Sequence, residues 1–184
     1  MNQDLKTMRD PMTYRFLQII WFMAVIVIII TSAYGLTETA REYMATGNIT
    51  IGQSMAEMDY PFTYFAKPIT YLSAAVVIFT YTTFKLYEKW ISNIPEIYRS
   101  ILIVSSLVVA FGSSYEVLYN FSIWNALITA DVIAGQLNID ILNVPYPDPD
   151  TPWNLVFATK GFFALAVSSS YSLYALQKIG QSIE

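Results

Sequence analysis

Apolar residues occur in four long runs along the chain, separated by shorter polar stretches. The runs cover about residues 16–36, 62–86, 97–123 and 152–176. A transmembrane helix needs about 20 mainly apolar residues to cross the hydrocarbon core of a bilayer, and each run reaches that length. The pattern therefore predicts an all-α integral membrane protein, one domain over residues 1–184, in which four transmembrane helices form a bundle.

The first run resembles the apolar part of a signal peptide in its position near the N-terminus. It is longer than the 7–15 apolar residues typical of such a segment, and no clear small-x-small cleavage site follows it. The sequence therefore favours a retained transmembrane helix over a cleaved signal.

Two further boundaries can be predicted from local residues. The third run continues as an amphipathic pattern to Ala134, and Gly135 follows, so we expect this helix to extend beyond the membrane. The fourth run is preceded by Asp150 and Thr151, either of which can cap a helix that has Pro152 at its first position. We therefore expect the fourth helix to begin at Pro152.

Lysine and arginine are distributed unevenly about the predicted spans. With four spans, both termini lie on the same side of the membrane. That side carries seven basic residues and the other side only Arg41. The seven are Lys6, Arg9, Arg15, Lys85, Lys89, Arg99 and Lys178. Because basic loops stay in the cytoplasm, we expect an N-in/C-in protein of the cell membrane with both termini cytoplasmic.

Residues 37–61 and 131–151 are the two outer loops of this topology. Both carry apolar residues that would otherwise meet water, so we expect the two loops to fold against each other.

Composition agrees with the membrane prediction and excludes several kinds of site. The 184 residues are 55% hydrophobic and only 13% charged, whereas soluble chains are about a quarter charged. The absence of cysteine and histidine excludes disulfides, iron–sulfur clusters, Cys or His zinc sites, the usual haem ligation and Cys- or His-based triads. We expect no cofactor, although bound lipid is compatible with the sequence. The net charge of −4 gives no nucleic-acid surface.

Two charged residues fall within predicted spans at nearly the same depth. Lys160 follows Pro152 by eight residues, or about 12 Å at 1.5 Å per residue. Glu116 lies a similar distance from the outer end of the third span, with Asn120 one turn away. Lys67 is slightly shallower in the second span. We therefore predict an intramembrane polar cluster in which Lys160 meets Glu116, with Lys67 and Asn120 close by.

The sequence leaves several roles open for this cluster. A facing Glu and Lys can form an interior ion pair that fixes helix register, or both lysines can extend their stems to the outer interface. Alternatively, the residues form an outward-facing polar pocket for an anion, a quinone head group or a small polar solute. Contact with a partner subunit is a further interpretation.

Stripes of small residues predict close helix packing; they comprise Gly161, Ala164, Ser168, Ser172 and Ala175 in the fourth run and Ser105, Gly112 and Ser113 in the third.

Asp148 and Asp150 are outer acidic candidates for a cation. Calcium needs six to eight oxygen ligands, so we predict no metal site from these two aspartates.

No catalytic constellation or soluble domain is evident, and four spans give little room for a transport path. We therefore predict a non-catalytic structural or accessory subunit of a larger integral membrane complex, with other membrane subunits as partners. The host complex, a membrane oxidoreductase among the options, cannot be read from the residues. The alternative is a small oligomeric transporter or channel lined by Lys160, Glu116 and Lys67. A third option is an enzyme acting on lipid or quinone.

Overall fold

The structure, a computed structural model, describes residues 11–63, 65–136 and 152–181, and these residues are helical with no strand. The four long helices are α2 (Pro11–Thr46), α4 (Pro68–Leu86), α6 (Glu96–Ile133) and α7 (Leu155–Gln181). Two short helices are α3 (Gln53–Glu57) and α5 (Glu88–Ser92). The all-α fold predicted from the sequence is therefore confirmed for these ranges.

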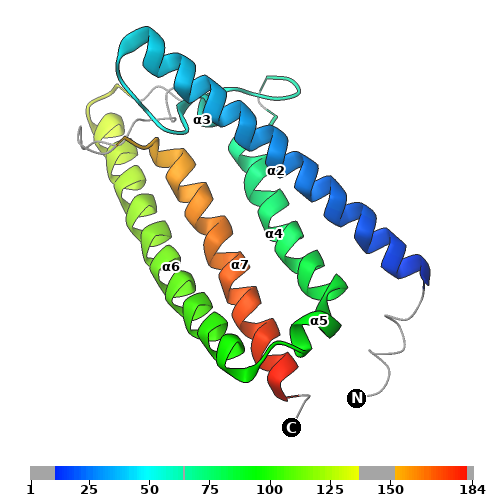
Figure 1. The fold of residues 1–184 in the computed structure, drawn as a ribbon. Coiled ribbons are helices and arrows are strands. Elements are labelled where there is room, and N and C mark those ends of the chain that lie inside the picture. The colour runs from blue at the N-terminus through cyan, green and yellow to red at the C-terminus, as the bar shows by residue number, and fades with distance from the viewer. Residues whose placement is uncertain (1–10, 64, 137–151, 182–184) are drawn as a thin grey trace.

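The four long helices lie side by side in one layer, in the order α2, α4, α7, α6 (Figure 1). Each packs on its neighbours in this row. Within the described residues α2 is not packed side by side with α6 or α7, and α4 is not packed side by side with α6. A closed bundle would bring α2 against α6. The described helices therefore form an open row where the sequence analysis expected a bundle, because apolar length predicts crossing but not which helices become neighbours.

Long helices that follow one another along the chain run in opposite directions, so the row neighbours α4 and α7 run parallel to each other (Figure 1). α2 begins and α7 ends at the same end of the row, which we call the inner end; the opposite end is the outer end (Figure 1). The short helix α3 packs at the outer end against α2, α4 and α7. At the inner end α5 packs on α7, where Ile91, Leu176 and Ile179 form a buried apolar cluster.

Three helices, α2, α4 and α6, are long and apolar enough to cross a membrane. The predicted fourth span, α7, is long enough at 27 residues but is more polar than these three. Its position explains the difference, since α7 has a helix on both sides and meets protein where an edge helix meets lipid. The described helices thus agree with a membrane protein, and the orientation of its termini stays a prediction.

The helix ends show which boundary predictions hold. α6 ends as expected before Gly135, which has a φ of 66°. The Gly135 amide donates to the carbonyl of Val132 (3.1 Å), and the Gln136 amide donates to that of Asp131 (2.9 Å). These two bonds form a Schellman motif, which satisfies carbonyls that the helix leaves free. α2 runs to Thr46, well past the predicted boundary at residue 36.

The start of α7 differs from the prediction. The helix begins at Leu155, and Asn154 caps it: the Asn154 Oδ1 atom accepts hydrogen bonds from the amides of Val156 and Phe157, both at 3.0 Å. Asn154 is completely buried, and its Nδ2 atom donates to Gln53 Oε1 at 2.7 Å. Pro152 lies before the helix, where its carbonyl accepts a hydrogen bond from the Ile51 amide.

Backbone bonds fasten the same region to the segment before α3. The amide of Ile51 donates to the carbonyl of Pro152 (2.6 Å), and the amide of Asn154 donates to the carbonyl of Ile51 (2.9 Å). The next residue, Gly52, has a φ of 83°, and a Cβ atom there would overlap the ring of Phe157. Residues 51–53 and the start of α7 thus form one junction at the outer end.

The orientation of the row can be tested with two exposed asparagines, because the chain contains no native cysteine. Asn48 lies near the outer end after α2, and Asn93 follows α5 at the inner end. We expect Asn48→Cys to react with a membrane-impermeant maleimide on intact cells and Asn93→Cys to react only after the cells are opened. Labelling only of Asn93→Cys on intact cells would invert the topology.

The junction predicts unequal effects for two glycines with similar backbone angles. Gly47 has a φ of 72° and open space around its Cβ position, whereas a Cβ at Gly52 meets Phe157. Gly47→Ala should lower the free energy of unfolding by about 1–2 kcal/mol through the left-handed conformation alone. Gly52→Ala should cost about 1–3 kcal/mol more because of the overlap. Equal losses in denaturant titrations in one detergent would contradict the described junction.

Candidate functional site

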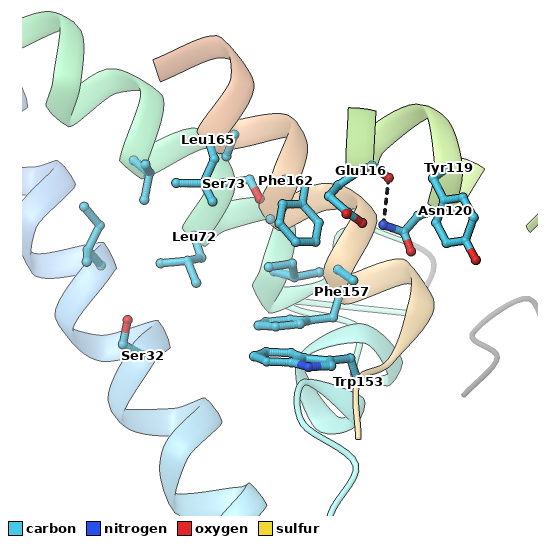
Figure 2. A pocket seen from close by; sticks show the side chains of 16 residues that line it. Ser32, Leu72, Ser73, Glu116, Tyr119, Asn120, Trp153, Phe157, Phe162 and Leu165 are labelled. Atoms are coloured by element: carbon cyan, nitrogen blue, oxygen red, sulfur yellow. Dashed lines mark hydrogen bonds between the residues drawn. The ribbon is translucent and has the colours of Figure 1, made fainter. Parts of the chain in front are cut away.

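A groove with a volume of about 770 Å³ is lined by residues of all four long helices. We call it the outer groove, because it includes the first turns of α4 and α7 at the outer end (Figure 2). Most of its wall is apolar, with Ile28 from α2, Leu72 and Val76 from α4, and Phe162 and Leu165 from α7. Pockets for small molecules commonly have this size and this apolar character.

Two stacked aromatic rings lie at one end of the outer groove. The ring centroids of Trp153 and Phe157 are 6.2 Å apart, and their planes differ by 9°. Figure 2 shows the ring of Phe157 above that of Trp153. The junction fixes both rings, because Trp153 lies between the two bonds to Ile51 and Phe157 packs on Gly52. The stack therefore gives this end of the groove a rigid aromatic wall.

The opposite wall, from α6, carries Asn120 with an unused acceptor. The side chain is 1% exposed, and its Nδ2 atom donates to the carbonyl of Glu116 at 2.7 Å (Figure 2). Only the amide nitrogen can donate to a carbonyl, so this bond also fixes the identity of Oδ1 as the acceptor. Within the described residues Asn120 Oδ1 has no hydrogen-bond partner. A buried acceptor of this kind is costly unless something donates to it.

Glu116 lines the same wall one turn earlier on α6. No hydrogen bond or ion pair to its carboxylate is found within residues 11–63, 65–136 and 152–181. A charged side chain at the centre of a transmembrane helix costs at least about 2.5–3.5 kcal/mol on insertion scales. The carboxylate and the Asn120 acceptor together make this wall negative and rich in acceptors.

Lys160 does not meet Glu116 in the structure. Its Nζ atom donates to the hydroxyl of Thr70 at 3.0 Å, and its carbonyl accepts a hydrogen bond from Ser73 at 3.2 Å. Lys160 is not among the groove residues. The predicted pair is not formed, because equal depth on neighbouring helices does not decide how each helix is rotated. Consecutive helical residues point about 100° apart, so Gly161 lines the groove while Lys160 does not.

Lys67 lies near Lys160 and binds residues at and just after the end of α3. Its Nζ atom is 2.7 Å from Asp59 Oδ1 and donates to the carbonyl of Glu57, also at 2.7 Å. The ammonium groups of Lys67 and Lys160 are close enough to repel each other. The predicted cluster therefore separates into two pairs: Glu116 with Asn120 in the outer groove, and Lys67 with Lys160 outside it.

Some of the small residues predicted for close packing are buried between helices, and others are not. Ala164, Ser168 and Ala175 of α7 are buried as expected. Gly161 and Gly112 are not in close helix contacts, since a Cβ atom at either would have nothing within 4 Å. Gly161 widens the outer groove, and Gly112 leaves open space on α6.

The acidic candidates for a cation lie in a part of the chain that the structure does not describe. In the part that it does describe, no group of three or more Asp or Glu residues is found that could hold an ion. Asp148 and Asp150 lie outside the described residues, as does most of the loop 131–151 that was expected to pack on residues 37–61. The segment 51–53 packs on the start of α7, and the packing of the two loops on each other stays a prediction.

Sequence reasoning missed the aromatic stack and the buried cap. Trp153 and Phe157 are four residues apart, the spacing that places two side chains on one helical face. Asn154 directly precedes an apolar run, which is a usual position for a helix cap. Both signals were present in the sequence, but no sequence signal indicates that Gly52, far away along the chain, supports the Phe157 ring.

The chain matches no family model, no curated protein and no solved structure. Its function is therefore argued from the geometry of the row and the outer groove. That geometry provides an apolar, ligand-sized recess with hydrogen-bond acceptors on one wall and an aromatic stack at one end.

Two double-mutant cycles test the assignment of Lys160. Lys160→Met combined with Glu116→Gln should change the free energy of unfolding additively, within about 0.5 kcal/mol, because the side chains share no contact. Lys160→Met combined with Thr70→Val should show a coupling of about 1 kcal/mol or more, because both remove one charge-assisted hydrogen bond. The reverse pattern, measured in one detergent, would restore the pairing of Lys160 with Glu116.

Proposed function

We propose that the chain is a non-catalytic subunit of a larger membrane complex and that a partner helix packs on the exposed side of α6. The observation that carries this proposal is the open row: α2 and α6 each have a helix on only one side within the described residues. A row of this kind offers two free edges where helices of other subunits can add.

Two small residues on α6 offer a place where another helix can approach closely. Ser105 and Gly112 are two turns apart on one side of α6, and both are exposed. A glycine offers lipid little apolar surface, whereas helices in membranes approach each other closely through small residues. The open space at Gly112 therefore fits a partner backbone.

The α2 edge carries large apolar side chains. Its exposed residues include Ile26, Ile29 and Ile30 in the middle of the helix. Large branched side chains suit a lipid boundary, since they bury much apolar area in the hydrocarbon core. α6 also exposes large apolar residues, among them Val108, Phe111 and Leu118. The open space at Gly112, and not the overall composition, therefore supports α6 as the edge that receives a partner.

The alternative is a small oligomeric transporter or channel, and the outer groove favours it in one respect. The groove is a recess that a solute could enter, but an open row of four helices encloses no path by itself. Further copies of this chain would have to complete the wall of such a path. The two proposals therefore differ in what surrounds the chain.

Purification from the native membrane in mild detergent, with mass measurement of what co-migrates, separates these proposals. We expect foreign subunits in fixed stoichiometry with this chain. An assembly that contains only copies of this chain would reject the subunit proposal in favour of the transporter.

A substitution on α6 tests the proposed contact. Gly112→Leu adds bulk where the chain itself has open space, so the isolated protein should keep its melting temperature while partner recovery falls at least about tenfold, as expected for an overfilled contact. Ala33→Leu, an exposed small residue on α2, is the matched control and should leave recovery unchanged. Undiminished recovery with Gly112→Leu would reject the α6 contact.

A further inference from the structure

We propose that the outer groove binds a membrane amphiphile with a protonated amine head, held by Glu116 and Asn120, with its apolar chain along the α4 and α7 walls. This inference does not rest on the proposed function, because the site lies within one chain. Its residues come from all four long helices and need no partner.

The polar wall defines the head group of the ligand. Glu116 presents a carboxylate, and Asn120 presents a buried Oδ1 atom without a partner. Both accept hydrogen bonds, so the complementary group is a donor, and the carboxylate favours a positive one. The lysines expected to neutralise Glu116 do not line the groove. A primary ammonium group has three donors and one positive charge, and it can satisfy both acceptors at once.

The rest of the groove defines the body of the ligand. Leu72, Val76, Phe162 and Leu165 offer apolar surface, and a volume of about 770 Å³ accommodates an alkyl chain of moderate length. A small hydrophilic cation would leave these walls without a partner. A partner helix is about 10 Å across with its side chains, so it would need a groove that runs along the whole row. The part of α4 that lines the outer groove is confined to residues 69–76.

The aromatic stack gives the proposal a spectroscopic reporter. Trp153 forms part of the groove and lies against Phe157. Bromine atoms on an alkyl chain quench tryptophan fluorescence only at contact distance. A chain-brominated alkylamine should therefore quench Trp153 when it occupies the groove, and the difference between the wild type and Trp153→Phe isolates that signal from the other three tryptophans.

The experiment uses the full chain in phosphatidylcholine nanodiscs, titrated with a brominated alkylamine or with the brominated alcohol of equal length. We expect saturable quenching of Trp153 by the amine at mole fractions at least tenfold lower than by the alcohol. Glu116→Gln should remove most of this preference. Asp131→Asn changes an exposed carboxylate on the same helix and should preserve it.

A second pair of variants tests the amide. Asn120 and Asn125 both donate to the carbonyl four residues earlier, at 2.7 and 2.8 Å, but Asn120 is buried in the groove and Asn125 is exposed. Asn120→Leu should weaken amine binding at least fivefold, and Asn125→Leu should not. Melting temperatures in the same nanodiscs identify a variant that fails to fold, in which case Asn120→Ser replaces Asn120→Leu.

A further titration with chain-brominated phosphatidylethanolamine decides whether the amine head belongs to a bilayer lipid or to a free amine. Saturable quenching of Trp153 by this lipid assigns the groove to a bilayer aminolipid, whereas quenching by the alkylamine alone assigns it to a free long-chain amine. Quenching that rises linearly and equally for amine and alcohol would overturn the proposal. A partner helix cross-linked to the groove wall in the native complex would also overturn it.

Discussion

The buried Asn154 side chain determines where α7 begins, and the position of α7 organises the rest of the described chain. Its cap bonds start the helix, and its bond to Gln53 ties that start to the first residue of α3. Because Asn154 is completely buried, its polar atoms must all be paired inside the protein. The same junction places the ring of Phe157 on Gly52, so the aromatic end of the outer groove depends on it.

The row also explains why its helices differ in composition. α2 stands at one edge and is the most apolar of the helices that can cross a membrane, while α4 stands inside the row and is the least apolar of the three. α7, which has helices on both sides, is more polar still. Polar side chains are tolerated where protein surrounds them, and hydroxyl groups there return hydrogen bonds to the helix backbone, as Ser169 does to Leu165.

The sequence predicted the parts of this fold that depend on local pattern. Apolar length identified the long helices, and Gly135 marked the end of α6 correctly because a residue with positive φ is required there. The arrangement of the helices was not predictable in the same way. Whether four helices close into a bundle depends on side-to-side contacts between distant segments, and no periodicity within one helix reports those contacts.

The candidate site shows the same limit at the level of single residues. Glu116 and Lys160 were placed at similar depth from residue counts, and Asn120 was correctly placed beside Glu116 because both are on one helix, one turn apart. Pairing across helices also requires the rotation of each helix about its axis. An error of one residue turns a side chain by about 100°, which is enough to move Lys160 from the groove to Thr70.

This separation of charges changes which ligands suit the groove. A pocket that contained Lys160 and Lys67 would favour an anion, which was one interpretation of the sequence. In the structure Lys67 is neutralised by Asp59 outside the groove, and the groove keeps the carboxylate of Glu116 and the acceptor of Asn120. An anion there would meet like charge in an apolar surrounding that strengthens the repulsion. The arrangement therefore disfavours anions and favours a donor of positive charge.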